Sequence, residues 1–187
     1  GIYAQGDHAE NAVKNSKEMF SDEVCICNTI EEVMKYRYRV ILADSFPAID
    51  ENTLLLKPKN IIVGLGCRKG ISEELLEKGL LEILKKNHLD MNQIEALVSI
   101  DLKKEEPAVV SLAEKYKVPF LTYSAEMLNE VEEVSSASSF VKKITGIDNV
   151  CERAAVTYCK KHCEYFELIA GKSIETAMTA AIARRNI

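Results

Sequence analysis

The segment from Asn60 to Gly70 combines residue types that bind anions. An apolar run, Ile61–Val63, leads into a stretch with three glycines, one cysteine and two positive charges. Ser72, which follows, is a residue type that commonly caps the N-terminus of a helix. A strand that ends in a glycine turn and leads into a helix brings backbone N–H groups and the helix N-terminus together, and both attract negative charge. We therefore predict an anion-binding site in this segment.

The loop itself supplies the candidate ligand contacts, which are Gly64, Gly66, Cys67, Arg68 and Lys69. Arginine and lysine bind carboxylates through charge-assisted hydrogen bonds, which the loop N–H groups would supplement. The alternative is that the glycines only permit a tight turn between strand and helix. A dinucleotide fingerprint does not fit, because Lys69 stands where its third glycine is required. A phosphate-binding P-loop does not fit either, because no Gly-Lys-Ser/Thr triplet follows.

Cys67 is a candidate nucleophile as well as a candidate ligand contact. A thiol at the end of a strand and near a helix N-terminus tends to have a lowered pKa, which favours the reactive thiolate. The three histidines, however, lie in segments that look peripheral, and none adjoins this cysteine in the sequence. Burial as a small side chain is therefore the alternative for Cys67.

Asp101 ends a second apolar run, Ala96–Ile100, and charged residues follow at once, among them Lys103 and Glu106. In open α/β sheets the carboxyl ends of the strands line the ligand crevice, so we expect Asp101 to lie beside the glycine loop. There its carboxylate could act as a general base, or it could cap a helix or hydrogen-bond the loop. The residues alone leave both roles open.

The remaining cysteines form no convincing metal site. Cys159, His162 and Cys163 all fall within one predicted helix, and no second pair of ligands matches them elsewhere, so we expect no metal site. Cys25 and Cys27 are expected on one face of a strand, in the core. Six cysteines in a chain of this size indicate reduced thiols rather than a disulfide framework.

Strands that alternate with helices would position these residues. Predicted strands cover residues 1–4, 24–27, 40–43, 61–65, 96–101, 118–123, 166–170 and 178–183. Predicted helices cover about 9–20, 29–36, 72–86, 107–116, 124–128, 138–144 and a longer segment that Asp148 caps. The last two strands, joined by a short polar loop with Gly171 and Lys172, suit an antiparallel hairpin. We predict an α/β fold: a three-layer α/β/α domain with a mostly parallel mixed sheet, preceded by a smaller partial α/β unit.

One glycine inside a predicted helix carries its own expectation. Gly79 weakens the helix over residues 72–86 by roughly 1 kcal/mol relative to alanine. We therefore expect a packing reason for a glycine at this position.

Residues 50–59 have the polar residues and the proline of a linker, interrupted by Leu54–Leu56. We place a domain boundary here, with a partial α/β unit at residues 1–57 and the main α/β domain at residues 58–187. The first unit is small for a domain, and the chain enters its first strand directly at Gly1. We therefore expect a fragment of a longer protein.

Composition limits the classes of function. The 187 residues are 47% hydrophobic and 28% charged, as in ordinary soluble globular proteins. The net charge of -5 argues against a nucleic-acid partner, since duplex binding normally requires a basic face. No apolar run approaches the roughly 20 residues of a membrane span, so we expect no membrane partner and a cytoplasmic location.

Several segments together resemble the CbiG/CobE cobalamin biosynthesis family. They are Gly64–Gly70, Ser99–Lys103 with Glu106–Pro107, Val150–Ala155, and Lys172 with Thr179–Ala183. The first two look like the paired signatures of the family, the third like its late helix, and the last like its closing lysine-to-strand element. A run similar to the middle region of CbiG, Glu51–Leu54, precedes them. CobE proteins generally carry only the later domain, so the chain resembles the middle and C-terminal regions of CbiG.

The resemblance implies a role in the anaerobic branch of vitamin B12 synthesis. CbiG is the cobalt-precorrin-5A hydrolase, which opens a δ-lactone on the macrocycle and releases acetaldehyde. Its substrate carries many carboxylates around a flat ring, which adds Lys103, Lys172 and Thr179 to the expected substrate contacts. Asp101 or Glu106 would be the base that activates water, while positive groups or loop N–H groups would stabilise the oxyanion. Cobalt would arrive in the substrate, so no cofactor is expected.

The resemblance also leaves alternatives. CbiG proteins have an additional N-terminal domain that this chain lacks, so the chain could instead be a non-catalytic corrinoid-binding module of the same pathway. Other enzymes of that pathway are candidate partners. A nucleotide-binding α/β domain, suggested by the glycine loop alone, is a third reading.

Overall fold

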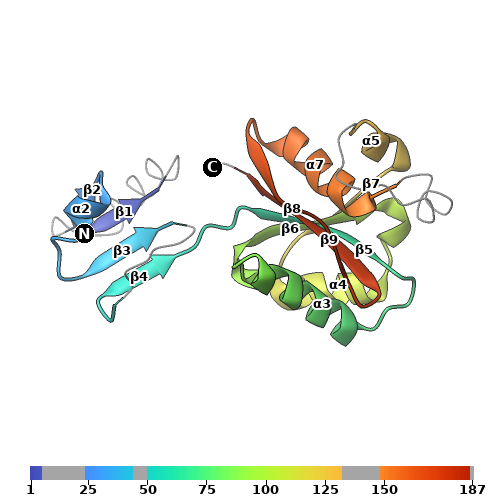
Figure 1. Ribbon diagram of the computed structural model, residues 1–187, viewed down its shortest axis with the longest axis horizontal. Helices are drawn as coiled ribbons and strands as arrows, with labels where there is room; N and C mark the ends of the chain where they lie inside the picture. Colours follow the sequence, from blue (N-terminus) through green and yellow to red (C-terminus); the bar gives the residue numbers. More distant parts are fainter. Residues whose placement is uncertain (6–23, 44–49, 132–147, 186–187) are drawn as a thin grey trace. The chain divides into compact units, whose positions relative to one another are not determined.

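The computed structural model describes residues 1–5, 24–43, 50–131 and 148–185, which are drawn as coloured ribbon in Figure 1. These residues form two compact units, Gly1–Pro58 and Lys59–Asn186. The helices predicted at residues 9–20 and 138–144 lie outside the described residues. No helix of the described part is long and apolar enough to cross a membrane.

The smaller unit contains a four-stranded parallel sheet in the order β2-β1-β3-β4. Its elements are β1 (Ile2–Ala4), β2 (Ile26–Cys27), α2 (Ile30–Val33), β3 (Arg39–Leu42) and β4 (Thr53–Leu56). The core is small, with Cys27, Val33 and Ile41 buried in it. Cys25 precedes β2 and is exposed, so the prediction that it faces the core with Cys27 was wrong.

Strand β4 lies within the stretch that the sequence predicted as a linker. Its pairing with β3 buries Leu55 partly, while Leu54 and Leu56 stay exposed, as expected for a strand at the edge of a sheet. The buried Arg39 side chain donates to the Thr53 hydroxyl at 3.0 Å and forms an ion pair with Asp50. The Arg39 guanidinium holds the pKa of Asp50 down, to about 2.

The larger unit has three layers around a five-stranded mixed sheet in the order β7-β6-β5-β9-β8. Its strands are β5 (Ile61–Cys67), β6 (Ile94–Ile100), β7 (Phe120–Tyr123), β8 (Phe166–Glu175) and β9 (Met178–Arg185). Its helices are α3 (Glu73–Lys86), α4 (Pro107–Tyr116), α5 (Ala125–Asn129) and α7 (Val150–His162), with 3-10 turns η1 (Met91–Gln93) and η2 (Asp101–Lys103). Helices α3 and α4 cover one face of the sheet, and α5 and α7 cover the other (Figure 1). This confirms the predicted three-layer α/β/α fold with a mixed sheet.

The central strand β5 is buried on both faces. Ile61, Val63 and Leu65 belong to the core beneath α3 and α4, and Ile62 belongs to the core beneath α7. A strand covered by helices on both sides needs apolar residues at nearly every position, which explains the continuous apolar run in the sequence. The site at the end of β5 is therefore held by a rigid strand.

Residue types in the sequence predicted the starts of α3 and α4 correctly, but not the start of α7. Ser72 caps α3 and Pro107 is the first residue of α4, as predicted. Asp148 does not cap α7; the N-cap is Asn149, whose side chain accepts the N–H of Glu152. Asp148 instead binds Arg153, because an arginine within reach is a stronger partner for a carboxylate than a backbone N–H.

Gly79 has the packing reason that the sequence suggested. A Cβ atom at this position would lie 2.5 Å from the sulfur of Met178, which belongs to β9. The glycine therefore lets α3 approach the sheet closely.

The closing hairpin is longer than predicted, and its turn lies elsewhere. Strand β8 runs through Gly171 and Lys172 to Glu175, and the turn falls before Met178, with Ala177 at a φ of 63°. The pairing register of β8 with β9 shifts between Ala170 and Ser173. The polar pair that looked like a turn is therefore an irregularity inside the strand, where an extra residue is accommodated.

Candidate functional site

The predicted ligand-binding residues gather at one end of the sheet of the larger unit. Parallel strands β5 and β6 both end there, and β9, which is antiparallel to β5, begins there. In this pairing Gly66 lies opposite Thr179, and Cys67 lies opposite Met178. The loop after β5 and turn η2 after β6 therefore share an edge of the sheet.

Most backbone N–H groups of the loop after β5 already donate hydrogen bonds to other parts of the protein. The N–H of Arg68 donates to the carbonyl of Ala177 at 3.1 Å, and the N–H of Gly70 donates to Glu106 at 2.8 Å. Gly70 has a φ of 71°, so a glycine is required at this turn. The side chains of Arg68 and Lys69 are exposed. Positive charge for a ligand therefore comes from these side chains more than from the backbone.

Glu106 is a buried carboxylate that ties the loop down. It is 6% exposed, and its second oxygen accepts from the Lys103 ammonium at 2.9 Å. Burial opposes ionisation, but the bonds from Lys103 and from the N–H of Gly70 outweigh it and hold the pKa of Glu106 below its usual value. With both oxygens occupied, Glu106 is built to hold the loop and Lys103 in place. Its predicted role as a base stays a prediction.

Asp101 lies in turn η2, beside that ion pair, and is exposed. Among the residues that the structure describes, no side-chain hydrogen bond or ion pair involves its carboxylate. Leu102, next to it, is 66% exposed, an unusual exposure for a leucine. Of the two predicted bases, Asp101 is the one whose oxygens can reach a water molecule and a ligand.

The thiol of Cys67 differs from the expectation for the end of a strand. The side chain packs against the core beneath α3 and α4, and burial raises its pKa despite the nearby ammonium of Lys103. The expectation of a lowered pKa was therefore wrong, because desolvation disfavours the thiolate more than the lysine favours it. Cys67 is a half-buried neutral thiol at the rim of the site.

The two glycines of β5 serve close packing on the α7 face. A Cβ atom on Gly64 would lie 1.8 Å from the carbonyl oxygen of Cys151, so the start of α7 rests directly on this strand. A Cβ atom on Gly66 would lie 2.6 Å from the Thr179 hydroxyl, which donates to the Gly66 carbonyl at 3.4 Å. Gly64 is buried, whereas Gly66 and Thr179 are partly exposed and can contact a ligand.

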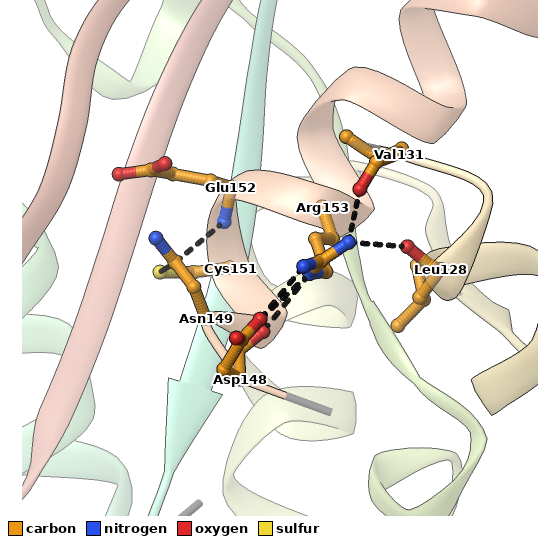
Figure 2. A network of polar contacts seen from close by, with 7 residues as sticks. All are labelled: Leu128, Val131, Asp148, Asn149, Cys151, Glu152 and Arg153. Atoms are coloured by element: carbon orange, nitrogen blue, oxygen red, sulfur yellow. Dashed lines mark hydrogen bonds and ion pairs between the residues drawn. The ribbon is translucent and has the colours of Figure 1, made fainter. Parts of the chain in front are cut away.

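The start of α7 is fixed by a network of polar contacts, shown in Figure 2. Asn149 has a φ of 50°, and its side-chain oxygen accepts from the N–H of Glu152 and from the thiol of Cys151, both at 3.3 Å. Arg153 donates to Asp148 and to the carbonyl oxygens of Leu128 and Val131. These bonds connect α7 to the end of α5 and leave little freedom at the helix start.

Glu152 and Lys172 complete the site on this side. The Glu152 side chain is fully buried and accepts the backbone N–H of Lys172 in the irregular part of β8. Burial raises the pKa of Cys151 to about 11; the Thr179 hydroxyl and the Lys172 charge act against this rise, and the Glu152 charge adds to it. In the pairing of β8 with β9, Ser173 lies opposite Ala180 and Ile174 opposite Thr179, so Lys172 lies close to Thr179.

Glu152 is a site residue that sequence reasoning missed. An acidic residue in the first turn of a helix is common because it interacts with the helix dipole. The presence of a glutamate at this position therefore did not indicate a role in the site. Only the fold reveals its unusual position, buried and bonded to another strand.

A cavity of about 730 Å³ lies elsewhere in the larger unit, along α4 and β7. Its lining includes Val110, Val118, Phe120 and Leu121, and none of the predicted site residues. The lining also includes the charged residues Lys104, Glu114 and Lys117. The residues that the sequence singled out lie at the strand ends instead.

The strand ends thus carry cations both on the loop after β5 and on β8. Arg68 and Lys69 lie on the loop side, and Lys172 lies on the α7 side. Gly66 and Thr179 form the surface between them, with the Asp101 carboxylate at one edge. Such an arrangement can hold a ligand that bears several carboxylates and place one water molecule near a base.

Comparison with known proteins identifies relatives for this region. The family model described as "Cobalamin synthesis G C-terminus" matches residues 61–183, which include every predicted site residue. A cobalt-precorrin-5A hydrolase from Priestia megaterium is 33% identical over 135 residues, which are 72% of this chain and 35% of the relative. A "Probable cobalt-precorrin-5A hydrolase" from Methanocaldococcus jannaschii is 28% identical over 182 residues, 92% of this chain and 56% of the relative.

A solved structure is similar to the larger unit. It is that of CobE, a protein from the cobalamin (vitamin B12) biosynthetic pathway, with a TM-score of 0.63 and 29% identity. The likeness covers 68% of this chain and 91% of that chain. The chain spans about a third to just over half of the length of the two curated relatives.

Proposed function

Because the chain belongs to the cobalamin synthesis G C-terminus family, as its sequence resemblance indicated, we propose that it is part of a cobalt-precorrin-5A hydrolase. In this proposal the strand ends of the larger unit bind the cobalt corrinoid. The two curated relatives, whose names carry this activity, support the assignment of the reaction.

The observation that carries the proposal is the arrangement of cations around the surface of Gly66 and Thr179. A corrinoid precursor is a flat ring with carboxylates around its edge. Arg68 and Lys69 on one side and Lys172 on the other would bind carboxylates at separate points of that edge. Gly66 has no side chain and Thr179 has a small one, and both are partly exposed, so they leave room for the face of a ring.

The reaction would begin with attack of water on the lactone carbonyl. Asp101 would take a proton from that water, since its carboxylate is exposed and unpaired among the described residues. The side chains of Arg68 and Lys69 would stabilise the oxyanion, because the N–H groups of Arg68 and Gly70 are occupied. When the acyl C–O bond breaks, it leaves a carboxylic acid and an alkoxide. The alkoxide oxygen forms the C=O of acetaldehyde as the C–C bond to the ring breaks, and the ring carbon keeps that electron pair and takes a proton.

Cobalt belongs to the substrate in this scheme. The described residues would bind the edge of the ring, and the metal would enter and leave with the corrinoid. Within the same proposal the protein would work in the cytoplasm, beside the other enzymes of the pathway.

Titration of the purified protein tests this proposal. The probe is dicyanocobyrinic acid, a cobalt corrin with free carboxylates, followed by visible absorbance and calorimetry, with NAD as the competing ligand class. Saturable corrinoid binding is expected. Saturable NAD binding without a corrinoid response would refute the proposal. Incubation with cobalt-precorrin-5A, with acetaldehyde as the readout, tests the reaction itself.

A second candidate is a non-catalytic corrinoid-binding module. The likeness to CobE favours it, because the larger unit alone corresponds to 91% of that separate protein. Corrinoid binding without acetaldehyde release would support this candidate for the chain.

A further inference from the structure

We propose that the buried carboxylate of Glu152 is a positioning residue, which fixes the ammonium of Lys172 where it binds a carboxylate of the ligand. The inference rests on the proposed function, since it assigns one contact within the proposed corrinoid site. It concerns two residues on different elements, α7 and β8, that are 20 positions apart in the sequence.

The first observation is the bond between Glu152 and the backbone of Lys172. Lys172 lies where the register of β8 shifts against β9, so its N–H has no regular place in the ladder of that sheet. Glu152 supplies the acceptor for this N–H and is itself fully buried. Water does not compete for a buried bond, so this contact fixes the irregular backbone and hence the direction of the Lys172 side chain.

The second observation is the location of Glu152 itself. Its backbone is held by the side chain of Asn149, and the neighbouring Arg153 anchors the helix start to α5 (Figure 2). In Figure 2 the Glu152 carboxylate points away from Arg153, on the other side of the start of α7. The Glu152 carboxylate therefore projects from a helix start that is firmly held, and the adjacent Arg153 binds other groups.

The third observation is that the Lys172 ammonium is left available. Among the described residues it has no hydrogen-bond or ion-pair partner, and the side chain is partly exposed. Lys172 lies one residue before Ser173, which pairs with Ala180 next to Thr179, so it lies close to the surface proposed for the ring. A cation without a counter-ion among the described residues is suited to bind an anionic ligand group.

A second buried glutamate lies on the opposite side of the site. Glu106 is buried, accepts the backbone N–H of Gly70 in the loop after β5, and lies beside a lysine, Lys103. There, however, the lysine is paired with the glutamate. Lys172 differs because Glu152 binds its backbone, so its ammonium remains for the ligand.

The experiment compares two corrin probes that differ only in charge. Dicyanocobyrinic acid carries carboxylates, and its fully amidated form carries carboxamides on the same ring. Affinities of both probes are measured for wild type, Lys172→Ala, Glu152→Ala, which removes the acceptor for the Lys172 N–H, and the double variant. Glu95→Ala is the matched control, since Glu95 binds Arg185 and Tyr158 away from the proposed site.

Lys172→Ala should weaken binding of the carboxylate probe about tenfold, the effect of one charge-assisted bond, and leave the amidated probe within about twofold. Glu152→Ala should have a similar selective effect, and the double variant should be no weaker than the single ones, because Glu152 acts through Lys172. Glu95→Ala should resemble wild type. A purely structural role for Glu152 would weaken both probes equally, and this result would overturn the inference.

Folding of each variant is checked by circular dichroism. If Glu152→Ala does not fold, Glu152→Asp is measured, whose shorter side chain withdraws the acceptor from the Lys172 N–H and should lose the same preference. A folded Glu152 variant with the wild-type preference for the carboxylate probe would also overturn the inference. Failure of wild type to bind either probe would refute the proposed function instead, so the two failures are distinguishable.

Discussion

Replacement of Glu106 by glutamine tests how the loop after β5 is held. Glutamine keeps an oxygen that can accept the N–H of Gly70, but it loses the ion pair with Lys103. Exposed pairs contribute about 0–1 kcal/mol, whereas removal of one partner of a fully buried pair costs about 3–5 kcal/mol. The side chains of Glu106 and Lys103 are 4% and 15% exposed, between these limits, so we expect a loss of about 2 kcal/mol.

The direction of the pKa shift of Glu106 predicts how this loss of stability changes with pH. The folded protein lowers the pKa of Glu106, so its contribution to stability is fully present above the unfolded pKa, about 4.3. That contribution is lost as the pH falls through the folded pKa. The difference in free energy of unfolding between wild type and Glu106→Gln should therefore be constant near neutral pH and shrink in acid.

Urea unfolding of the whole chain, followed by circular dichroism between pH 3 and 7, measures this difference. Glu105→Gln is the matched control, because Glu105 is the exposed neighbour and its change should cost less than about 0.5 kcal/mol. Glu106→Ala, which also removes the acceptor for Gly70, should cost about 1 kcal/mol more than Glu106→Gln. Equal stability of Glu106→Gln and wild type at pH 7, or a difference that grows in acid, would refute the reasoning.

Three further predictions concern the glycine loop, the strand beneath α7 and the thiols. Arg68→Ala should weaken binding of dicyanocobyrinic acid about tenfold and more than Cys67→Ser does; the opposite order in a titration would indicate a thiol role. Gly64→Ala should cost about 3 kcal/mol or more in urea unfolding, because its Cβ would overlap the Cys151 carbonyl; an unchanged midpoint would contradict the packing. Exposed Cys25 should react with a thiol reagent at once, and buried Cys151 only on unfolding; prompt modification of both would show that α7 opens.

The sequence predicted the architecture of the larger unit because its signals were local. Continuous apolar runs indicated buried strands, and Ser72 and Pro107 marked helix starts by their own chemistry. The edge strand β4 was not predicted. An edge strand buries little and leaves Leu54 and Leu56 exposed, so the leucines at 54–56 do not alternate with polar residues in the way that indicates a strand. The turn of the last hairpin was misplaced because Gly171 and Lys172 are typical turn residues, whereas the actual turn uses Ala177.

The candidate site could be predicted only in part. The loop after β5 and Asp101 were expected together, since strand ends of a parallel sheet meet at one edge. The family resemblance added Lys172 and Thr179. The role of Glu152 could not be predicted, because it depends on a bond between a helix and an irregular strand that are distant in sequence. For Cys67 the sequence left a reactive thiol and a buried side chain open, and only the tertiary fold shows that burial raises its pKa.

The central claim is that the corrinoid binds at the strand ends of the larger unit. A crystal structure of the protein with dicyanocobyrinic acid tests it most directly. The account predicts a ring over Gly66 and Thr179, with carboxylates bound by Arg68 or Lys69 on one side and by Lys172 on the other. A ring bound instead in the cavity along α4 and β7, with these cations free, would contradict it.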